Sequence, residues 1–289
     1  MSSNHSSEVE MKRSIQIPIL AVILLGMSTF ARADFTFVQI TDTHTGPAET
    51  VFNARFNETI RQIQGIKPAF VIHTGDALQG WSVESAKLFN SFTYRIPCPT
   101  YISPGNHDIP ELQKIGAEKA SALVTAWNRA IGPDRISFVY ENCVFIGLDS
   151  NLWNTGYVEE KVQLQWLKSE LRKSKKRRIF IFEHSPLYLD TPDEKNGNYF
   201  AVDNPVRDEL LKLFKKYQVE AVITGHYHRM NSTVFNGTSF LTSPAISFSC
   251  DPDQGLTGYT VFKVYTGGFS HRFVDFRTVG SPPDFGGKK

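Results

Sequence analysis

The chain has 289 residues, of which 41% are hydrophobic and 12% aromatic, enough to build one substantial core. Its formal net charge is +2, from 31 Lys and Arg against 29 Asp and Glu. So balanced a charge argues against a general nucleic-acid or membrane-surface binder. After the first thirty-odd residues there is neither an internal repeat nor a linker-like change of composition, so one folded domain is expected.

The first 33 residues have the pattern of a secretory signal peptide. A short basic region and an apolar stretch, residues 12–30, precede the small-x-small cleavage pattern Ala31-Arg32-Ala33. The apolar stretch is short for a membrane span, and no Cys follows it to accept a lipid. We expect cleavage before Asp34, no stable membrane anchor afterwards and a secreted or periplasmic protein; an uncleaved anchor is the alternative. The domain is then expected at 34–280, followed by a flexible tail at 281–289.

Neither the cysteines nor the serines indicate a nucleophilic enzyme. The three cysteines, Cys98, Cys143 and Cys250, allow at most one internal bridge and lack the spacing of a metal finger, so buried free thiols are favoured. A serine or cysteine hydrolase is not supported because no Gly-x-Ser-x-Gly elbow occurs.

The first half of the chain alternates predicted strands and helices. Short apolar strands are expected at 35–40, 69–73 and 100–103, with helices at 51–63 and 83–92 between them. Strand, helix and strand in this order imply right-handed parallel crossovers, which bring the carboxyl ends of the strands to one edge of a sheet.

The second half predicts a second sheet. Its expected elements are a helix at 119–131, a hairpin at 136–140 and 144–148, a helix at 158–173 with Val162, Leu164, Leu167 and Leu171 inward, a strand at 179–182, a helix capped by Asn204 with Pro205 first, and strands at 219–224, 233–235, 238–242, 259–264 and 271–276. The predicted fold class is α/β (α+β), a four-layer αββα sandwich of two mixed β-sheets flanked by helices.

Polar blocks follow five of the predicted strands. Five histidines lie in these blocks beside Asp, Asn or Gly, and their joint placement favours a metal site at the strand ends over separate structural roles. His73 and His271 lie within strand patterns and are interpreted as packing residues. The blocks are Asp42-Thr43-His44, Gly75-Asp76, Gly105-Asn106-His107-Asp108, His184 and Gly225-His226-Tyr227-His228.

In this order, the blocks resemble the calcineurin-like metallophosphoesterase superfamily over roughly residues 35–228. The block that continues to Arg229, and the stretch from His184 to residue 200, resemble the branch of calcineurin-like phosphoesterase domain-containing proteins. Two features depart from other relatives. The Tyr that purple acid phosphatases place three residues after the Asp of Gly75-Asp76 is absent, and so is the Arg that follows the Gly-Asn-His block in several phosphatases.

The resemblance implies two divalent metal ions, Mn, Fe or Zn, and a role for each polar residue. Two such ions about 3.5–4 Å apart would clamp the attacking and leaving oxygens of a phosphate ester and activate a shared hydroxide to attack phosphorus. His107 is then the general acid, and Asp108 orients it. Asp42, His44 and His228 are assigned to the first metal, Asn106, His184 and His226 to the second, and Asp76 to both.

The expected charge of the site favours an anionic substrate. Two divalent ions, two Asp carboxylates and one hydroxide leave about +1 in a poorly solvated pocket, and neutral Asn106 preserves this surplus. A phosphomonoesterase is favoured; a phosphodiesterase or cyclic-nucleotide phosphodiesterase is the alternative, and a catalytically silent metal-binding module is a further one. The deciding loop, 187–202, carries acidic and aromatic residues that could border the substrate, or it is a solvated surface turn.

Overall fold

The computed structural model describes residues 34–109 and 112–278. The expected signal peptide at 1–33 and tail at 281–289 lie outside these residues and remain predictions. Among the described residues, none of the helices combines the length and the apolar character needed to cross a bilayer.

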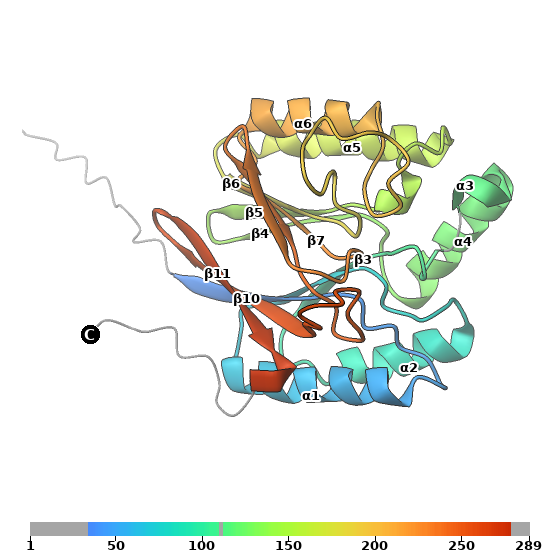
Figure 1. The fold of residues 1–289 in the computed structure, drawn as a ribbon. Helices are drawn as coiled ribbons and strands as arrows, with labels where there is room; N and C mark the ends of the chain where they lie inside the picture. Colours follow the sequence, from blue (N-terminus) through green and yellow to red (C-terminus); the bar gives the residue numbers. More distant parts are fainter. Residues whose placement is uncertain (1–33, 110–111, 279–289) are drawn as a thin grey trace, which may run out of the picture. The chain divides into compact units, whose positions relative to one another are not determined.

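The described residues form two mixed sheets (Figure 1). In the first, β1, β2 and β3 are parallel, β10 runs antiparallel to β1, and β11 pairs with β10 at the edge. The strands are β1 (Phe35–Ile40), β2 (Val71–Thr74), β3 (Thr100–Ser103), β10 (Gly258–Tyr265) and β11 (Gly268–Asp275). The helices that follow β1, β2 and β3 are α1 (Thr50–Ile66), α2 (Val83–Thr93), α3 (Leu112–Ile115) and α4 (Ala117–Ala130).

The second sheet has the order β4-β5-β6-β7-β9-β8. Strands β5, β6, β7 and β9 are mutually parallel, and β4 and β8 close the two edges in antiparallel pairs. The strands are β4 (Ile136–Tyr140), β5 (Cys143–Gly147), β6 (Arg178–Phe182), β7 (Ala221–Thr224), β8 (Asn231–Phe235) and β9 (Thr238–Thr242). The connections contain η1 (Ser150–Leu152), α5 (Val158–Lys173) and α6 (Val206–Tyr217), and η2 (Phe276–Thr278) follows β11.

Aromatic side chains fill the space between the two sheets. The rings of Phe37 and Phe262 stack at 4.6 Å in the first sheet, those of Phe145 and Phe180 stack at 5.0 Å in the second, and Phe37 meets Phe145 edge-on at 5.3 Å across the interface. Separate apolar clusters join the first sheet to α1, α2 and α4, and the second to α5 and α6. The predicted four-layer αββα sandwich is therefore confirmed.

Details of the helices differ from the prediction. Val162 is 43% exposed because α5 buries Gln163, Leu167 and Leu171 instead, and the Gln163 amide bonds both backbone groups of Asp149. The apolar spacing of residues 51–63 also predicts Val51 on the buried face of α1, but Val51, in the first turn, is 59% exposed. Both inward assignments are wrong, because a buried polar side chain or a helix end changes the apolar face.

The start of α6 also differs by one residue. Pro205 occupies the capping position and the helix begins at Val206, one residue later than predicted. Asn204 nevertheless accepts a hydrogen bond from Asp208 N, 3.2 Å away, so its side chain still satisfies a backbone donor of the first turn.

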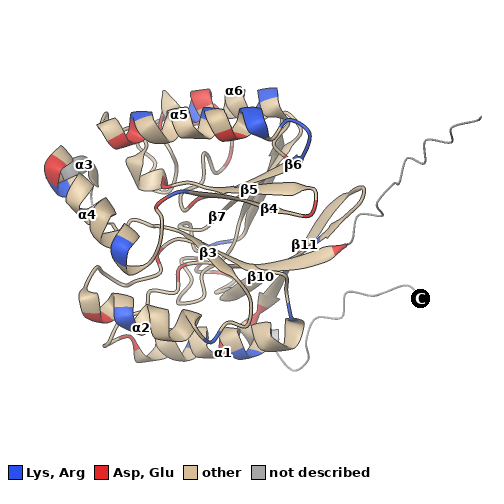
Figure 2. Cartoon of the chain, turned by 180° about the vertical axis from the view of Figure 1, so that it is seen from behind, with Lys and Arg blue, Asp and Glu red and all other residues tan. Residues whose placement is uncertain are grey.

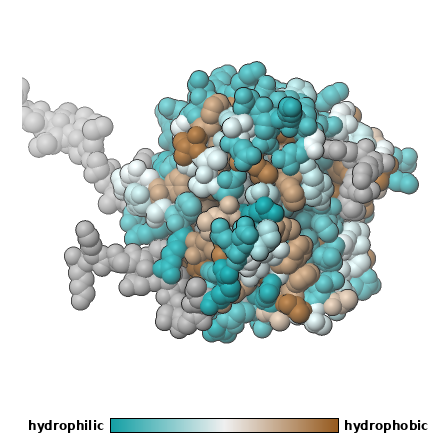
Figure 3. All heavy atoms as spheres, viewed as in Figure 1, coloured by the Kyte–Doolittle hydropathy of each residue, from teal (hydrophilic) through white to brown (hydrophobic). Residues whose placement is uncertain are grey.

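Basic residues gather where α5 ends and the chain turns into β6 (Figure 2). Arg177 donates to the Glu141 carbonyl at 3.1 Å, and Arg178 forms an ion pair with Glu220. The surface over α5 and α6 is largely hydrophilic (Figure 3). The basic run is thus a solvated helix end, where positive charge suits the helix dipole.

Candidate metal centre

The candidate site lies where the parallel strands of both sheets end. Four strands are each followed, two positions after their last residue, by one candidate ligand. These pairs are β1 with Asp42, β2 with Asp76, β6 with His184 and β7 with His226. Backbone hydrogen bonds join these turns, from Asp42 N to Gly75 O at 2.9 Å and from His44 N to Asp76 O at 3.0 Å. The four strand ends therefore present their polar side chains to one another.

Five of the seven predicted metal ligands have left-handed backbone conformations, with φ between 46° and 65°. Residues other than Gly rarely adopt this backbone conformation, and each one that does destabilises the folded state by about 1–3 kcal/mol. The conformation turns each side chain sharply back over the strand end. These residues are Asp42, His44, Asp76, His226 and His228.

The first group of donors consists of Asp42, His44, Asp76 and His228, whose ligand atoms all lie within 4.8 Å of one another. His228 Nε2 is 3.0 Å from Asp42 Oδ1, and His44 Nε2 is 3.7 Å from Asp76 Oδ2. All four side chains are buried. Two carboxylates and two imidazoles at this spacing suit a divalent transition metal or zinc.

The second group consists of Asp76, His184 and His226, within the same 4.8 Å limit, and Asn106 lies beside it. His184 Nε2 is 3.3 Å from Asp76 Oδ2 and 3.0 Å from Asn106 Oδ1. Asp76 belongs to both groups, as a residue that bridges two ions must. The structure thus brings all seven predicted ligands together.

Hydrogen bonds to backbone carbonyls determine the tautomers of three histidines. His228 Nδ1 donates to Phe248 O at 2.9 Å, His184 Nδ1 to Thr74 O at 2.8 Å and His226 Nε2 to Tyr199 O at 3.0 Å. In the neutral ring the other nitrogen then carries only a lone pair. At His228 and His184 that lone pair faces a carboxylate oxygen, an arrangement that needs a proton or a metal ion between the two atoms.

The pKa values of the buried histidines fall into two classes. Burial lowers the pKa of His184, but Asp76 outweighs it and raises the pKa to about 10. For His228 the same competition between burial and Asp42 raises the pKa. Burial prevails at His44 and His226 and lowers their pKa values to about 4. Without metal, His184 is therefore protonated at neutral pH, and Asp42 favours a proton on His228.

His107 borders the site and is oriented by a group that the sequence did not reveal. Its ring lies 4.7 Å from that of His44, and its Nδ1 donates to Gln79 O at 2.9 Å, which leaves Nε2 for a substrate. Asp108 was predicted to orient this ring. Its carboxylate instead accepts hydrogen bonds from Ala77 N, Leu78 N and Gly105 N, at 2.8 to 3.0 Å. Asp108 thus fixes the backbone next to Gln79 and acts on His107 one step further away.

Two further side chains hold the ligand turns. Asn151 Nδ2 donates to Gly105 O at 3.0 Å, just before Asn106 and His107. His73, interpreted from sequence as a packing residue, accepts from Gly75 N at 3.2 Å and bonds Thr43 Oγ1 at 3.0 Å. The role of His73 could have been inferred from its position in an apolar strand, two residues before Gly75-Asp76. The sequence around Asn151 gives no comparable signal.

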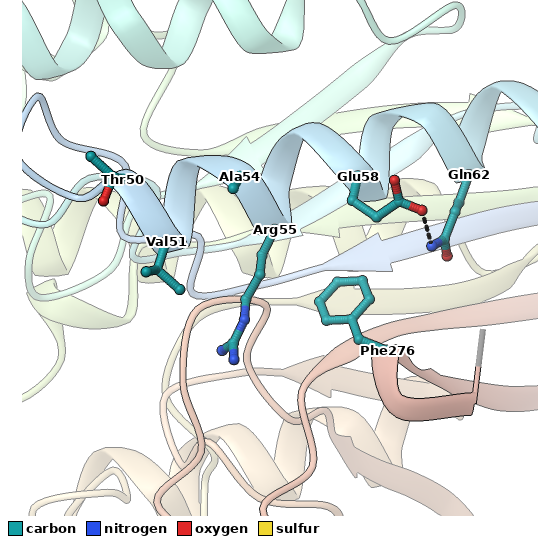
Figure 4. Close-up of a pocket in the computed structure, with 7 residues that line it drawn as sticks. All are labelled: Thr50, Val51, Ala54, Arg55, Glu58, Gln62 and Phe276. Carbon is teal, nitrogen blue, oxygen red and sulfur yellow. Dashed lines mark hydrogen bonds between the residues drawn. The ribbon is translucent and has the colours of Figure 1, made fainter.

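A groove on the surface of α1 lies outside this centre (Figure 4). It is an open groove of about 510 Å³ between one face of α1 and Phe276. The groove is lined by Thr50, Val51, Ala54, Arg55, Glu58, Gln62 and Phe276. None of the nine predicted site residues is among them. The groove is therefore separate from the candidate metal ligands.

The sequence profile of the calcineurin-like phosphoesterases matches residues 35–230 of this chain, which span both groups of donors. The chain belongs to the calcineurin-like phosphoesterase family. Members of this family use a dinuclear metal centre and hydrolyse phosphate esters, so the two donor groups are candidate ligands of such a centre.

Relatives of this calcineurin-like phosphoesterase include both phosphatases and phosphodiesterases. The serine/threonine-protein phosphatase CPPED1 of Danio rerio is 28% identical over 61% of this chain but only 56% of its own length. The probable glycerophosphodiester phosphodiesterase GpdQ of Arcobacter nitrofigilis is 31% identical over 73% of this chain and 78% of its own. A crystal structure of a dimetal phosphatase from Danio rerio superposes with a TM-score of 0.63 at 16% identity, over 83% of this chain and 96% of its own, which shows the shared fold.

Proposed function

We propose that this chain is a two-metal phosphoric ester hydrolase that prefers phosphomonoesters. The observation that carries the proposal is the position of Asp76 between two groups of buried donors, with His107 beside them. Asp42, His44, His228 and Asp76 would hold one ion, and Asp76, Asn106, His184 and His226 the other. Bound divalent ions, Mn, Fe or Zn, would activate water and neutralise charge on the phosphoryl group.

The protein's own residues then position the ester and supply a proton. His107 keeps a proton on Nδ1 through Gln79 O, so Nε2 is the atom that can deliver a second proton to the departing oxygen. His107 N donates to Asp76 Oδ1 at 2.8 Å, which fixes the general acid relative to the shared carboxylate. A proton delivered there would matter most for esters with poor leaving groups.

The preference for monoesters is supported by the loop at 187–202 and by the relatives named as protein phosphatases. This loop places Tyr199 next to Asn106 and carries the exposed acidic residues Asp190 and Asp193, which would disfavour additional negative charge on the substrate. A phosphodiesterase is the second candidate, because GpdQ and a 3',5'-cyclic-nucleotide phosphodiesterase of Nostoc, 24% identical over 81% of this chain, are also relatives.

The test is a comparison of kcat/KM on phosphopeptides, nucleoside monophosphates, cyclic AMP and an aryl diester. The protein should be loaded in turn with Mn, Fe and Zn. We expect a monoester to be the best substrate under its best metal. A diester or cyclic nucleotide that wins by more than about tenfold would overturn the preference, and no turnover on any ester would favour a silent metal-binding module.

A further inference from the structure

Buried contacts hold the loop from residue 187 to residue 204 at both ends. Leu187, Tyr188 and Val202 are buried against the core below α5 and α6, and Val202 N donates to Pro186 O at 2.9 Å. Asn231 Nδ2 on β8 donates to Leu189 O at 2.7 Å. The segment is therefore attached to the second sheet at both ends, while most residues between 190 and 199 are exposed.

A buried arginine fixes the middle of the same loop. Arg207, in the first turn of α6, is 1% exposed, and its Nη2 donates to Glu194 O at 2.6 Å and Asn196 Oδ1 at 3.2 Å. Glu194 in turn accepts hydrogen bonds from Leu189 N and Asp190 N at 3.1 and 3.2 Å. A guanidinium buried this deeply depends on these partners, since leaving them unpaired would cost several kcal/mol. The loop and Arg207 thus fix each other.

The far end of the loop reaches the second group of metal donors. Tyr199 is 69% exposed, its hydroxyl lies 3.2 Å from Asn106 Nδ2, and its ring centre lies 5.0 Å from that of His226. The Phe200 ring lies 5.4 Å from His226 and 5.2 Å from Tyr227. His226 also donates to the Tyr199 carbonyl. An aromatic surface is therefore held directly against two candidate ligands.

We propose that Tyr199 and Phe200 form a fixed wall that contacts the organic group of the substrate and favours flat, aromatic esters, with Arg207 as the positioning residue. This rests on the proposed function. An aromatic ring of the substrate would bury apolar surface against these two rings and stack on them. The entropy cost of binding would be small, because the wall is ordered beforehand. The phosphoryl group would stay with the metal centre, so the wall selects the organic part alone.

The test uses phosphonates, which are not hydrolysed, as probes of the organic group. Inhibition constants of phenylphosphonate and methylphosphonate are measured against one chromogenic monoester, and binding of both to the metal-loaded protein is measured by calorimetry. We expect Tyr199→Ala and Phe200→Ala each to weaken phenylphosphonate by about three- to tenfold, the range of one aromatic contact, and to leave methylphosphonate within about twofold. Tyr199→Phe keeps the ring and should retain most of the phenylphosphonate affinity.

Arg207 needs a readout of loop position. Lys195 is exposed within the loop, so trypsin cleavage after it reports how well the loop is held. Arg207→Met should accelerate this cleavage and weaken phenylphosphonate selectively, and Arg207→Lys should restore part of both. Asn196→Ala, which removes one acceptor, provides a milder variant should Arg207→Met not fold. Lys168→Met is the matched control, because it removes a cation that pairs with Glu209 of α6 at 2.6 Å without touching the loop.

The outcomes separate this proposal from the proposed function. Equal weakening of both phosphonates, or no weakening of either, in Tyr199→Ala and Phe200→Ala would overturn the aromatic wall even in an active enzyme. A wild-type protein without turnover would contradict the proposed function, and the calorimetric comparison would still test the wall. Unchanged cleavage at Lys195 in both Arg207→Met and Asn196→Ala would refute the positioning role.

Discussion

Gln79 holds the ring of His107 through one hydrogen bond, 2.9 Å from its backbone oxygen to Nδ1. The neighbouring Leu78 N donates to Asp108 Oδ1 at 2.8 Å. The Asp108 carboxylate thus positions the backbone at residues 78–79, and this backbone positions His107, the proposed general acid. We call this chain of contacts the positioning relay. Because a backbone carbonyl orients the ring, a mutation of the Gln79 side chain would leave this contact in place.

Asp108→Asn should lower kcat by about 10- to 100-fold while the protein retains its metals. The Asn amide nitrogen cannot accept a hydrogen bond, so one of the three backbone N–H donors loses its partner and the Gln79 carbonyl shifts. Steady-state kinetics and metal analysis on the same preparation check this. Asp108→Asn with wild-type kcat would show that the relay does not position His107.

His107→Ala and Asp76→Asn should separate proton delivery from metal binding. His107→Ala should reduce kcat by about 10²–10⁴-fold, more for poor than for good leaving groups, with both ions retained. Asp76→Asn should lower the occupancy of both ions, because Asp76 belongs to both donor groups. Metal analysis beside kinetics measures both effects, and an empty site in His107→Ala would contradict the assignment.

Metal loading at pH 6 should release about two protons per protein from the histidine ligands, which must be deprotonated to bind, and about one more if a bound water ionises to hydroxide. Asp76 and Asp42 raise the pKa values of His184 and His228 against the effect of burial, so both are protonated without metal. His44 and His226, with pKa values lowered to about 4, are already neutral. Calorimetry in buffers of different ionisation enthalpy counts the protons. His228→Ala should reduce the count by about one and His226→Ala should not; equal counts in the two variants would be inconsistent with this account.

The metal-free protein should lose stability through His73 as the pH falls below about 6.5. Burial lowers the pKa of His73 to about 3 in the folded state, so between these values only the unfolded chain takes up the proton. The contribution of neutral His73 to the free energy of unfolding is therefore fully present above pH 6.5. It is lost as the pH falls toward 3, by about 1.4 kcal/mol per pH unit. Protonation would also displace Gly75 N from Nδ1.

The measurement is urea denaturation of the metal-free protein between pH 7 and pH 4.5. His73→Asn keeps an acceptor near Gly75 N but does not titrate, so its free energy of unfolding should fall less steeply with pH than that of wild type. Parallel curves for the two proteins would exclude His73 as the source. His271→Asn serves as the comparison, because burial also lowers the pKa of His271, which lies on β11 at the edge of the first sheet.

The sequence predicted the elements that regular patterns specify. Strand β3 and helix α5 have the predicted bounds, because apolar runs and helical spacing define them, and the order of polar blocks predicted which residues would meet. The inward face of α5 was harder, since Gln163 occupies a core position that an apolar pattern assigns to Val162. Hydrogen bonds that a histidine donates to a backbone carbonyl, such as those of His107 to Gln79 O and of His226 to Tyr199 O, leave no mark in the sequence.

The reason why glycines are required at the site also could not be predicted from the sequence. The sequence pattern suggests turns with positive φ at Gly75, Gly105 and Gly225 alike, but of these three only Gly75 has such a φ. A Cβ at Gly105 would overlap the backbone nitrogen and carboxylate of Asp76, and one at Gly225 would overlap Thr41. These glycines are needed because segments from distant parts of the chain approach closely, a requirement that local turn chemistry does not reveal.

The left-handed backbone at Asp42, His44, Asp76, His226 and His228 bears on attempts to engineer this enzyme. Each of these residues holds a conformation that Gly adopts without penalty. A Gly there would relieve this strain, but it would also remove a buried side chain and leave its partner unpaired, such as His107 N, which donates to Asp76 Oδ1 at 2.8 Å. The strained backbone is therefore maintained by the contacts of these side chains with one another. Screens for stable variants should include a requirement for activity in every round, because any change that relaxes the backbone at these five positions also removes a candidate ligand.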